Sequence, residues 1–302
     1  MKRLTVLVSV LLFCVFSIYA ESRLHVAEEA EPGTVLTVYL EGFEPEASVT
    51  VTFADGRIIS ATGFMMPEDT DPPVEVAFLG IPCNVQPGPA TLILQGISDG
   101  TAVREERSVA VVERIFKTET IPLTEALTRL REEEKEARAL EAQKLYRILI
   151  TFSPESIYDP GPYGEPVQGA RISSWFGDRR TYTSPDGGRS RSIHSGIDLA
   201  APEGTAVFSS GAGRVAFSGR RIITGETIVV EHMPCVYCLY YHCRDRFVKA
   251  GEEVYKGQVI GTIGTTGLAT GPHLHWEFRV GGVPVDPQPL VRKGLLDQGE
   301  RT

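Results

Sequence analysis

Two histidines separated by one residue are the first feature of this sequence that could do chemistry. His273 and His275 open the run 273–280, which has the composition of a β-strand. Alternate side chains of a strand point to the same face, so the two imidazoles share one face while Leu274 and Trp276 point to the other. Imidazole nitrogen is a common zinc ligand, and the pair is therefore part of a potential metal site. By itself the pair also fits two structural strand histidines.

A histidine four residues before an aspartate is the second such feature. His194 and Asp198 point to one side of the chain in either a helix or an extended segment, and Ser195-Gly196 between them favours a loop that enters a strand. Imidazole and carboxylate are both zinc ligands. Taken alone, however, the spacing is better explained by an exposed histidine near an unrelated carboxylate.

A third candidate is His242, at the end of the run 238–242. Strict alternation along that run predicts that Cys238, Tyr240 and His242 share one face and that Leu239 and Tyr241 share the other. A lone histidine in a strand is usually structural, so this residue gains meaning only together with the first two elements.

The region that must position these histidines has the pattern of an antiparallel β domain. Short apolar runs alternate with glycine at nearly every junction between residues 168 and 288. The predicted strands are 205–209, 213–218, 226–231, 238–242, 258–263 and 273–280.

Taken together, the three elements resemble the LytM/lysostaphin-type zinc endopeptidases in order and in spacing. The motifs that carry the resemblance are His194-x-x-x-Asp198, Tyr241-His242 and Gly271-Pro272-His273-Leu274-His275, supported by Ser174-Trp-Phe-Gly177, Gly204-Thr-Ala-Val207, Gly257-Gln-Val-Ile-Gly261 and Gly264-Thr-Thr-Gly267. Two departures are visible nearby: Cys243 stands where the family usually has an apolar residue, and 233–238 replaces a turn that usually contains glycine.

The resemblance implies that His194, Asp198 and His275 bind one Zn²⁺ per chain. Three protein ligands leave the fourth tetrahedral position to water, which is typical of a catalytic site. Zinc lowers the pKa of such a water from about 15.7 toward 7. His242 and His273 would flank this water, one as the general acid–base and the other as the oxyanion stabiliser, and the sequence does not distinguish the two.

The activity implied by the resemblance is hydrolysis of peptide bonds in bacterial peptidoglycan, whose peptide stems would be the partner. The bond could belong to a peptide cross-link, as for a DD-endopeptidase, or to a glycine bridge, as for a glycyl-glycine endopeptidase. Two other functions stay open. The chain could be an inactive LytM-like module that activates another cell-wall hydrolase, although such modules typically lack a ligand. It could also be a structural envelope protein, but that role leaves His242 and His273 unexplained.

Composition agrees with a mostly β protein of about two domains. The chain has 302 residues, with 30 Gly and 20 Pro, and its net charge of −9 argues against nucleic acid as the main partner. We expect a small immunoglobulin-like β-sandwich at 21–116, without a catalytic cluster, and a LytM-type domain at 168–290. A helical linker and loop at 117–167 would connect the domains, and 291–302 would form a C-terminal tail.

The N-terminus has the pattern of an export signal. Lys2 and Arg3 precede an uncharged run that ends at Tyr19-Ala20, which predicts a cleavable signal peptide at 1–20 and a location in the periplasm or cell envelope. An uncleaved membrane anchor stays open, since the run is near the lower length limit for a spanning helix. Lipidation at Cys14 fits poorly, because a bulky Phe13 precedes it.

Four cysteines would remain after cleavage: Cys83, Cys235, Cys238 and Cys243. An oxidising compartment permits disulfides, and we expect at least one to involve Cys235 or Cys238. One Cys-x-x-Cys pair is too little for a structural zinc site. The sequence assigns neither the pairing nor an oligomeric state.

Overall fold

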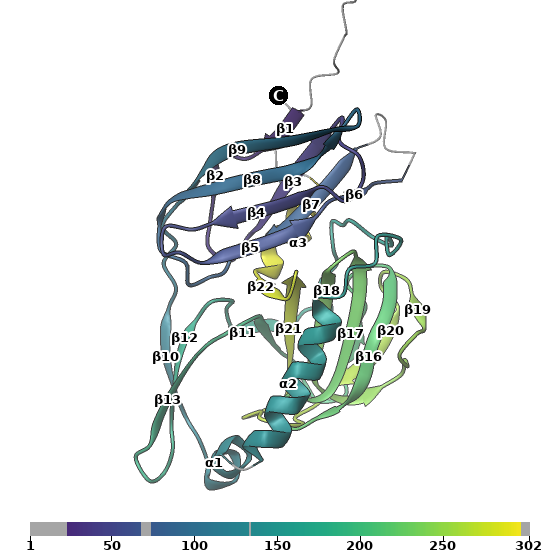
Figure 1. Ribbon diagram of the computed structural model, residues 1–302. Helices are drawn as coiled ribbons and strands as arrows, with labels where there is room; N and C mark the ends of the chain where they lie inside the picture. The colour runs from purple at the N-terminus through teal and green to yellow at the C-terminus, as the bar shows by residue number, and fades with distance from the viewer. Residues whose placement is uncertain (1–22, 68–73, 133, 297–302) are drawn as a thin grey trace, which may run out of the picture.

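The computed structural model describes residues 23–67, 74–132 and 134–296 (Figure 1). The predicted signal peptide at 1–20 lies outside these ranges, as does the end of the predicted tail. The mostly β prediction is confirmed, because the described residues form 22 strands and only three helices. None of these helices combines the length and the apolar character that crossing a membrane would require.

Two sheets form the N-terminal part of the molecule. One has the strand order β1 (Arg23–Val26), β3 (Val35–Glu41), β7 (Glu75–Gly80), β6 (Phe64–Met65). The other has the order β2 (Glu29–Ala30), β9 (Thr101–Val111), β8 (Gly88–Ser98), β4 (Ser48–Thr52), β5 (Ile58–Thr62). A shared apolar core lies between the sheets, as in the predicted sandwich. A turn at Asp55-Gly56 joins β4 to β5, and Gly56 has a positive φ of 82°, which glycine adopts without strain. The immunoglobulin-like assignment stays a prediction.

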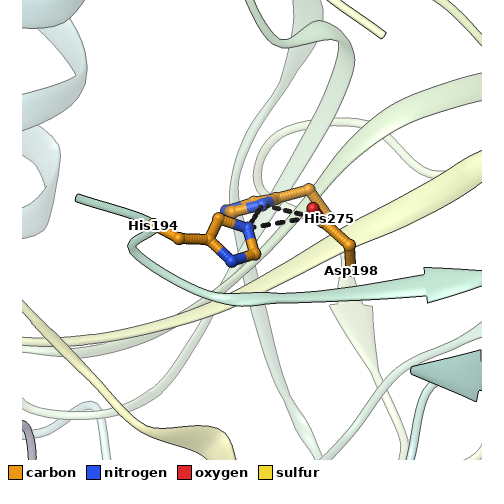
Figure 2. A group of neighbouring side chains, drawn as sticks. All are labelled: His194, Asp198 and His275. Carbon is orange, nitrogen blue, oxygen red and sulfur yellow. Dashed lines mark hydrogen bonds and ion pairs between the residues drawn. The ribbon is translucent and has the colours of Figure 1, made fainter. Parts of the chain in front are cut away.

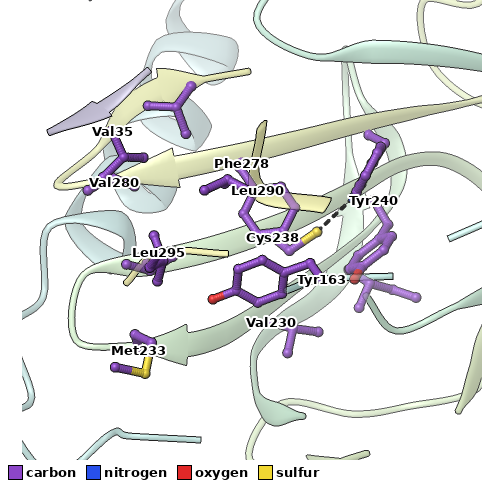
Figure 3. Close-up of a cluster of buried hydrophobic side chains, with 14 of the residues drawn as sticks. Val35, Tyr163, Val230, Met233, Cys238, Tyr240, Phe278, Val280, Leu290 and Leu295 are labelled. Atoms are coloured by element: carbon purple, nitrogen blue, oxygen red, sulfur yellow. Dashed lines mark hydrogen bonds between the residues drawn. The ribbon is translucent and has the colours of Figure 1, made fainter. Parts of the chain in front are cut away.

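The sheet that contains β3 and β7 is buried on both faces. Val38 and Leu40 of β3 pack into the sandwich core, whereas Val35 and Tyr39 pack into a second core. The second core continues into the C-terminal half, as Figure 3 shows for Val35 and Val280. A strand covered on both sides needs a continuous apolar run, and 35–40 has one apart from a single threonine. The two halves therefore share one core.

The linker differs from the single helix and loop that we expected. It contains β10 (Thr118–Pro122), α1 (Glu125–Glu132) and α2 (Lys135–Leu149), and Glu134 between the two helices has a left-handed φ of 56°. β10 pairs in parallel with β12 (Arg179–Thr183), and β12 forms a hairpin with β13 (Arg189–Ile193). Residues 179–192, although rich in Gly, Ser and Arg, are therefore part of a three-stranded sheet.

A ten-stranded sheet forms the C-terminal part. Its main order is β11 (Arg171–Ser174), β14 (Ile197–Ala200), β21 (His273–Val280), β18 (Val236–Arg246), β17 (Gly225–Met233), β16 (Gly213–Arg221), β19 (Glu253–Val254). β15 (Ala206–Phe208), β20 (Val259–Ile263) and β22 (Val283–Val285) attach to this order, and α3 (Pro287–Lys293) follows. Every pairing in this sheet is antiparallel, as predicted, and all six predicted runs fall on strands.

Opposite faces of this sheet meet different partners. Leu145 and Leu149 of α2 pack on Leu239 and Tyr241, so the helix lies across one face (Figure 1). The other face carries Trp276 with other large apolar side chains and joins the core shared with the N-terminal half. This division explains why α2 has only a thin apolar seam: it covers a single strip of one sheet.

The four cysteines of the described residues are free, contrary to the expected disulfide. Cys235 Sγ lies 3.3 Å from the carbonyl oxygen of Thr151, next to the end of α2. Cys238 Sγ instead accepts a hydrogen bond of 3.0 Å from Trp276 Nε1 in the opposite core. The two thiols therefore lie on different faces of the sheet, although only two residues separate them in sequence.

Glu75 of β7 is a buried carboxylate with an incomplete set of partners. Its residue exposure is 1%, and its Oε1 accepts a 3.2 Å hydrogen bond from Ala47 N. Its Oε2 has no hydrogen-bond partner among the described residues. Burial raises the pKa of Glu75 to about 7, because the charged form is poorly solvated there.

We predict that Glu75 makes folding stability fall as the pH rises. The folded-state pKa lies above the unfolded value, so its stabilising effect is complete below about pH 4.5 and is lost by about pH 7. Glu75→Gln should have the same melting temperature as the wild type near pH 4.5 and a higher one at pH 8. Its free energy of unfolding at pH 8 should exceed that of the wild type by on the order of 2–3 kcal/mol. Thermal melts of both proteins across this pH range measure the difference. A constant gap at every pH would contradict the prediction.

Candidate metal centre

A row of side chains across three neighbouring strands forms the base of the site. The strand registers place Asp198 of β14 opposite His275 of β21, and His275 opposite Tyr241 of β18. Directly opposed residues of antiparallel strands project to one face and touch. The Tyr241 ring stacks on the His275 ring at 5.3 Å between centroids and an interplanar angle of 6°. The sheet registers therefore fix His275 between an aspartate and an aromatic ring.

His194 reaches the row from the loop before β14. Its backbone N–H donates to Asp178 O at 2.9 Å, and its carbonyl accepts from Gly177 N at 2.8 Å. Gly196 then allows the chain to pass close to β21, since a Cβ there would stand 2.3 Å from Trp276 O. The two backbone hydrogen bonds and the close passage at Gly196 together direct the His194 side chain toward Asp198.

The three predicted metal ligands converge on one point (Figure 2). His194 Nε2 lies 3.0 Å from Asp198 Oδ1 and 2.9 Å from His275 Nδ1, and the last two atoms lie 2.9 Å apart. Atoms bound to a tetrahedral zinc at about 2.0–2.1 Å stand roughly 3.3 Å from one another. Two imidazole nitrogens and one carboxylate oxygen in a triangle of this size fit Zn²⁺ in both donor chemistry and spacing.

The nitrogens that face away from this triangle are tied to acceptors. His194 Nδ1 donates to Trp175 O at 2.7 Å, which leaves a lone pair on Nε2. His275 Nε2 lies 3.4 Å from a carboxylate oxygen of Glu277, which is itself 1% exposed. Such partners orient metal-binding histidines and fix their tautomers. Glu277 was missed in the sequence analysis, although alternation from His275 places it on the same face.

Charges within the site support a ligand role for Asp198. Burial alone would raise the pKa of Asp198, but its close contacts with the His194 and His275 rings hold it well below its usual value. The carboxylate is therefore ionised at neutral pH. Burial lowers the pKa of His194, which keeps its ring neutral and able to donate a lone pair.

His242 reaches the site by breaking the alternation of β18. We expected it to share a face with Cys238 and Tyr240, and that prediction is wrong. The register of β17 with β18 shifts next to Tyr240, and His242 has a φ of 61°. This bulge turns His242 to the face of Tyr241, while Cys243 takes the core position beside Tyr240. A positive φ is uncommon outside glycine and costs backbone energy, and such strain concentrates at functional sites.

His242 and His273 lie side by side at the edge of the ligand triangle. Their ring centroids are 4.8 Å apart, and His273 Nε2 lies 3.8 Å from Asp198 Oδ1. Each Nδ1 donates to a backbone carbonyl, that of Thr266 at 2.7 Å for His242 and that of Gly271 at 2.8 Å for His273. A neutral ring held in this way presents the Nε2 lone pair toward the site.

Burial, together with the nearby His273 and His275 rings, lowers the pKa of His242 to about 3.

The remaining two histidines lie elsewhere. His232 is fully buried, and its Nδ1 donates to Ala212 O. His25 lies near Glu41 at the surface of the N-terminal half.

A cleft of about 400 Å³ opens onto Asp198, His242, His273 and His275. Its lining includes Leu268 and the 270–273 segment, which ends in His273. Other lining residues come from the linker and from β12, and they are Glu119, Ile121 and Leu123 from the β10 segment, Leu127 from α1, and Arg180 and Tyr182 from β12. Residues far upstream of every sequence motif therefore shape the cleft.

Similarity to known proteins covers the C-terminal part of the chain for some of them and most of the chain for another. Residues 192–287 match the family described as Peptidase family M23. Peptidoglycan DD-endopeptidase ShyC of Vibrio cholerae is 40% identical over 125 residues, and DD-carboxypeptidase/endopeptidase Mpg of Neisseria meningitidis is 42% identical over 123 residues. Each alignment covers 41% of this chain but only 28% and 27% of the respective relative.

A solved structure described as a peptidase M23 from Pseudomonas aeruginosa is similar over a much longer stretch. It has a TM-score of 0.62 and 26% identity, with 88% of this chain and 95% of that chain covered. The likeness therefore extends beyond the site to the N-terminal sheets.

We predict that the purified protein binds one zinc ion per chain through the triangle. His194→Ala combined with Asp198→Ala should lower the zinc content far below one per chain, because a single remaining ligand cannot hold the ion. His242→Ala should keep most of its zinc, and His25→Ala is the matched control outside the site. Metal analysis by plasma mass spectrometry gives the stoichiometries. Full zinc content in the double variant would contradict the ligand assignment.

Proposed function

We propose that this chain, which carries a Peptidase family M23 domain at residues 192–287, is a zinc metalloendopeptidase that hydrolyses peptide bonds in bacterial peptidoglycan. The observation that carries the proposal is the convergence of five groups beside one cleft, which four of them line. Three of them form a ligand triangle, and His242 and His273 flank it with their Nε2 atoms available. A zinc site that served stability alone would need neither of the two flanking histidines.

Zinc, when bound, would activate a water and polarise the scissile carbonyl. Two histidines of the protein would take up the proton of this water and stabilise the oxyanion. The Nδ1 of His242 donates to Thr266 O, so its Nε2 is an acceptor, and His242 would act as the general base. His273, 4.8 Å away between ring centroids, would stabilise the oxyanion once its Nε2 carries a proton. The hydrogen bonds from the two Nδ1 atoms to backbone carbonyls hold both rings in place without further rearrangement.

The names of the relatives favour a peptide cross-link over a glycine bridge as the bond cut. ShyC is named a peptidoglycan DD-endopeptidase, and Mpg a DD-carboxypeptidase/endopeptidase. The cleft, lined by polar residues such as Asp198 and apolar ones such as Leu127, would accept an extended peptide stem. An exported protein in the periplasm or cell envelope, with residues 1–20 as its signal, would meet this substrate.

An activator module without catalysis is the main competing function. Its typical sign is the loss of a ligand, whereas all five groups are present and converge here. Incubation of the purified mature protein with peptidoglycan, with and without a chelator, separates the two functions. We expect chelator-sensitive release of muropeptides that have lost a peptide cross-link. Zinc-loaded protein that releases none would contradict the proposal.

We predict that His242→Ala and His273→Ala each slow peptidoglycan cleavage by about 10²- to 10⁴-fold, the usual contribution of a group that transfers a proton or stabilises charge. Both variants should retain zinc and a native circular dichroism spectrum, since neither residue belongs to the ligand triangle. His25→Ala is the control and should cleave at the wild-type rate. Loss of zinc from His242→Ala to the extent seen in His275→Ala would instead identify His242 as a ligand.

A further inference from the structure

Arg180 of β12 reaches from the three-stranded sheet to the metal ligand Asp198. Its Nη2 donates to Asp198 Oδ2 at 2.6 Å and to Ser174 Oγ at 2.7 Å. The Arg180 side chain is only 12% exposed, and that of Asp198 is 11% exposed. A largely buried guanidinium therefore occupies the carboxylate oxygen that does not face the histidines.

Glu119 of β10 holds the other side of this guanidinium. Arg180 Nε donates to Glu119 Oε1 at 2.5 Å, and Ser174 Oγ donates to the same oxygen at 2.9 Å. The β10–β12 register sets Glu119 directly opposite Arg180. The side chains of Glu119, Arg180 and Ser174 thus form a ring of hydrogen bonds that joins β10, β12 and β11. Arg180 links this ring to Asp198.

The geometry of Asp198 depends on this ring. Its Oδ1 faces both ligand nitrogens at 2.9–3.0 Å, and its Oδ2 is fixed by Arg180. Because Oδ2 is bonded to Arg180, only Oδ1 faces the metal position, and the orientation of the carboxylate is fixed. Without Arg180, the carboxylate could rotate, and Oδ2 would be left buried without its charged partner, which is costly.

We propose that Arg180 is a positioning residue that presents Asp198 to the metal, and that Glu119 of the linker strand in turn positions Arg180. The linker is then a structural part of the metal centre as well as a wall of the cleft. This inference rests on the zinc site of the proposed function, but it does not depend on the substrate. If Arg180 and Glu119 merely joined β10 to β12, their replacement would change stability and leave zinc affinity unaltered.

The test measures zinc affinity of the full chain by competition with a chromophoric chelator. Arg180→Gln should bind zinc about 10- to 100-fold more weakly than the wild type, the usual cost of losing a group that orients a metal ligand. The zinc affinity of Arg180→Lys should lie between those of Arg180→Gln and the wild type, because an ammonium group keeps the charge but lacks the forked geometry of a guanidinium. Arg104→Gln is the matched control, since the Arg104 side chain is 52% exposed and pairs with Glu106 on β9 of the N-terminal sheets.

Glu119→Gln keeps the size of the side chain, so it tests the proposal even if Arg180→Gln fails to fold. It should weaken zinc binding less than Arg180→Gln. The double variant should bind zinc no more weakly than Arg180→Gln alone, because Glu119 acts through Arg180. Wild-type affinity in folded Arg180→Gln, or in Glu119→Gln, would overturn the inference. A wild-type protein that takes up no zinc would overturn the metal centre itself.

Discussion

The strand register that sets Asp198 opposite His275 is the constraint on which the site depends. A shift of one residue between β14 and β21 would turn one of the two ligands into the apolar core, because strand side chains alternate between faces. The register is held by what lies on the other face, where Ile197 and Trp276 are buried together. Core packing on one side of the sheet thus fixes ligand geometry on the other side.

Much of this site could be predicted from the sequence, because its motifs are short and lie on regular strands. His273 and His275, with one residue between them, project together, and the loop before β14 brings His194 to Asp198 as its Ser-Gly content suggested. The role of Tyr241-His242 could be expected only from family resemblance. Alternation gave the wrong face for His242, because a bulge with a left-handed residue has no sequence signal in a run of this kind.

The contributions from distant segments could not be predicted, because nothing in the local sequence specifies which strands meet. Nothing in the sequence around Glu119 marks it as a site residue, and only the pairing of β10 with β12 brings it there. Residues 179–192 are rich in Gly, Ser and Arg, as loops often are, yet pairing on both sides of β12 makes them a hairpin. Similarly, the apolar run of β3 suggested a sandwich strand but not a second core on its outer face.

The shared core has a consequence for the order in which the chain can fold. Thr37 Oγ1 donates to Leu295 O, a contact across 258 residues of sequence, and the outer face of β3 and β7 packs on residues of β21 and β22. During synthesis the N-terminal sheets emerge first, with Tyr39 and Phe78 still uncovered. That apolar face stays open to other chains until the last strands arrive. This face therefore completes its burial at the same late stage as the ligand triangle, because both need β21.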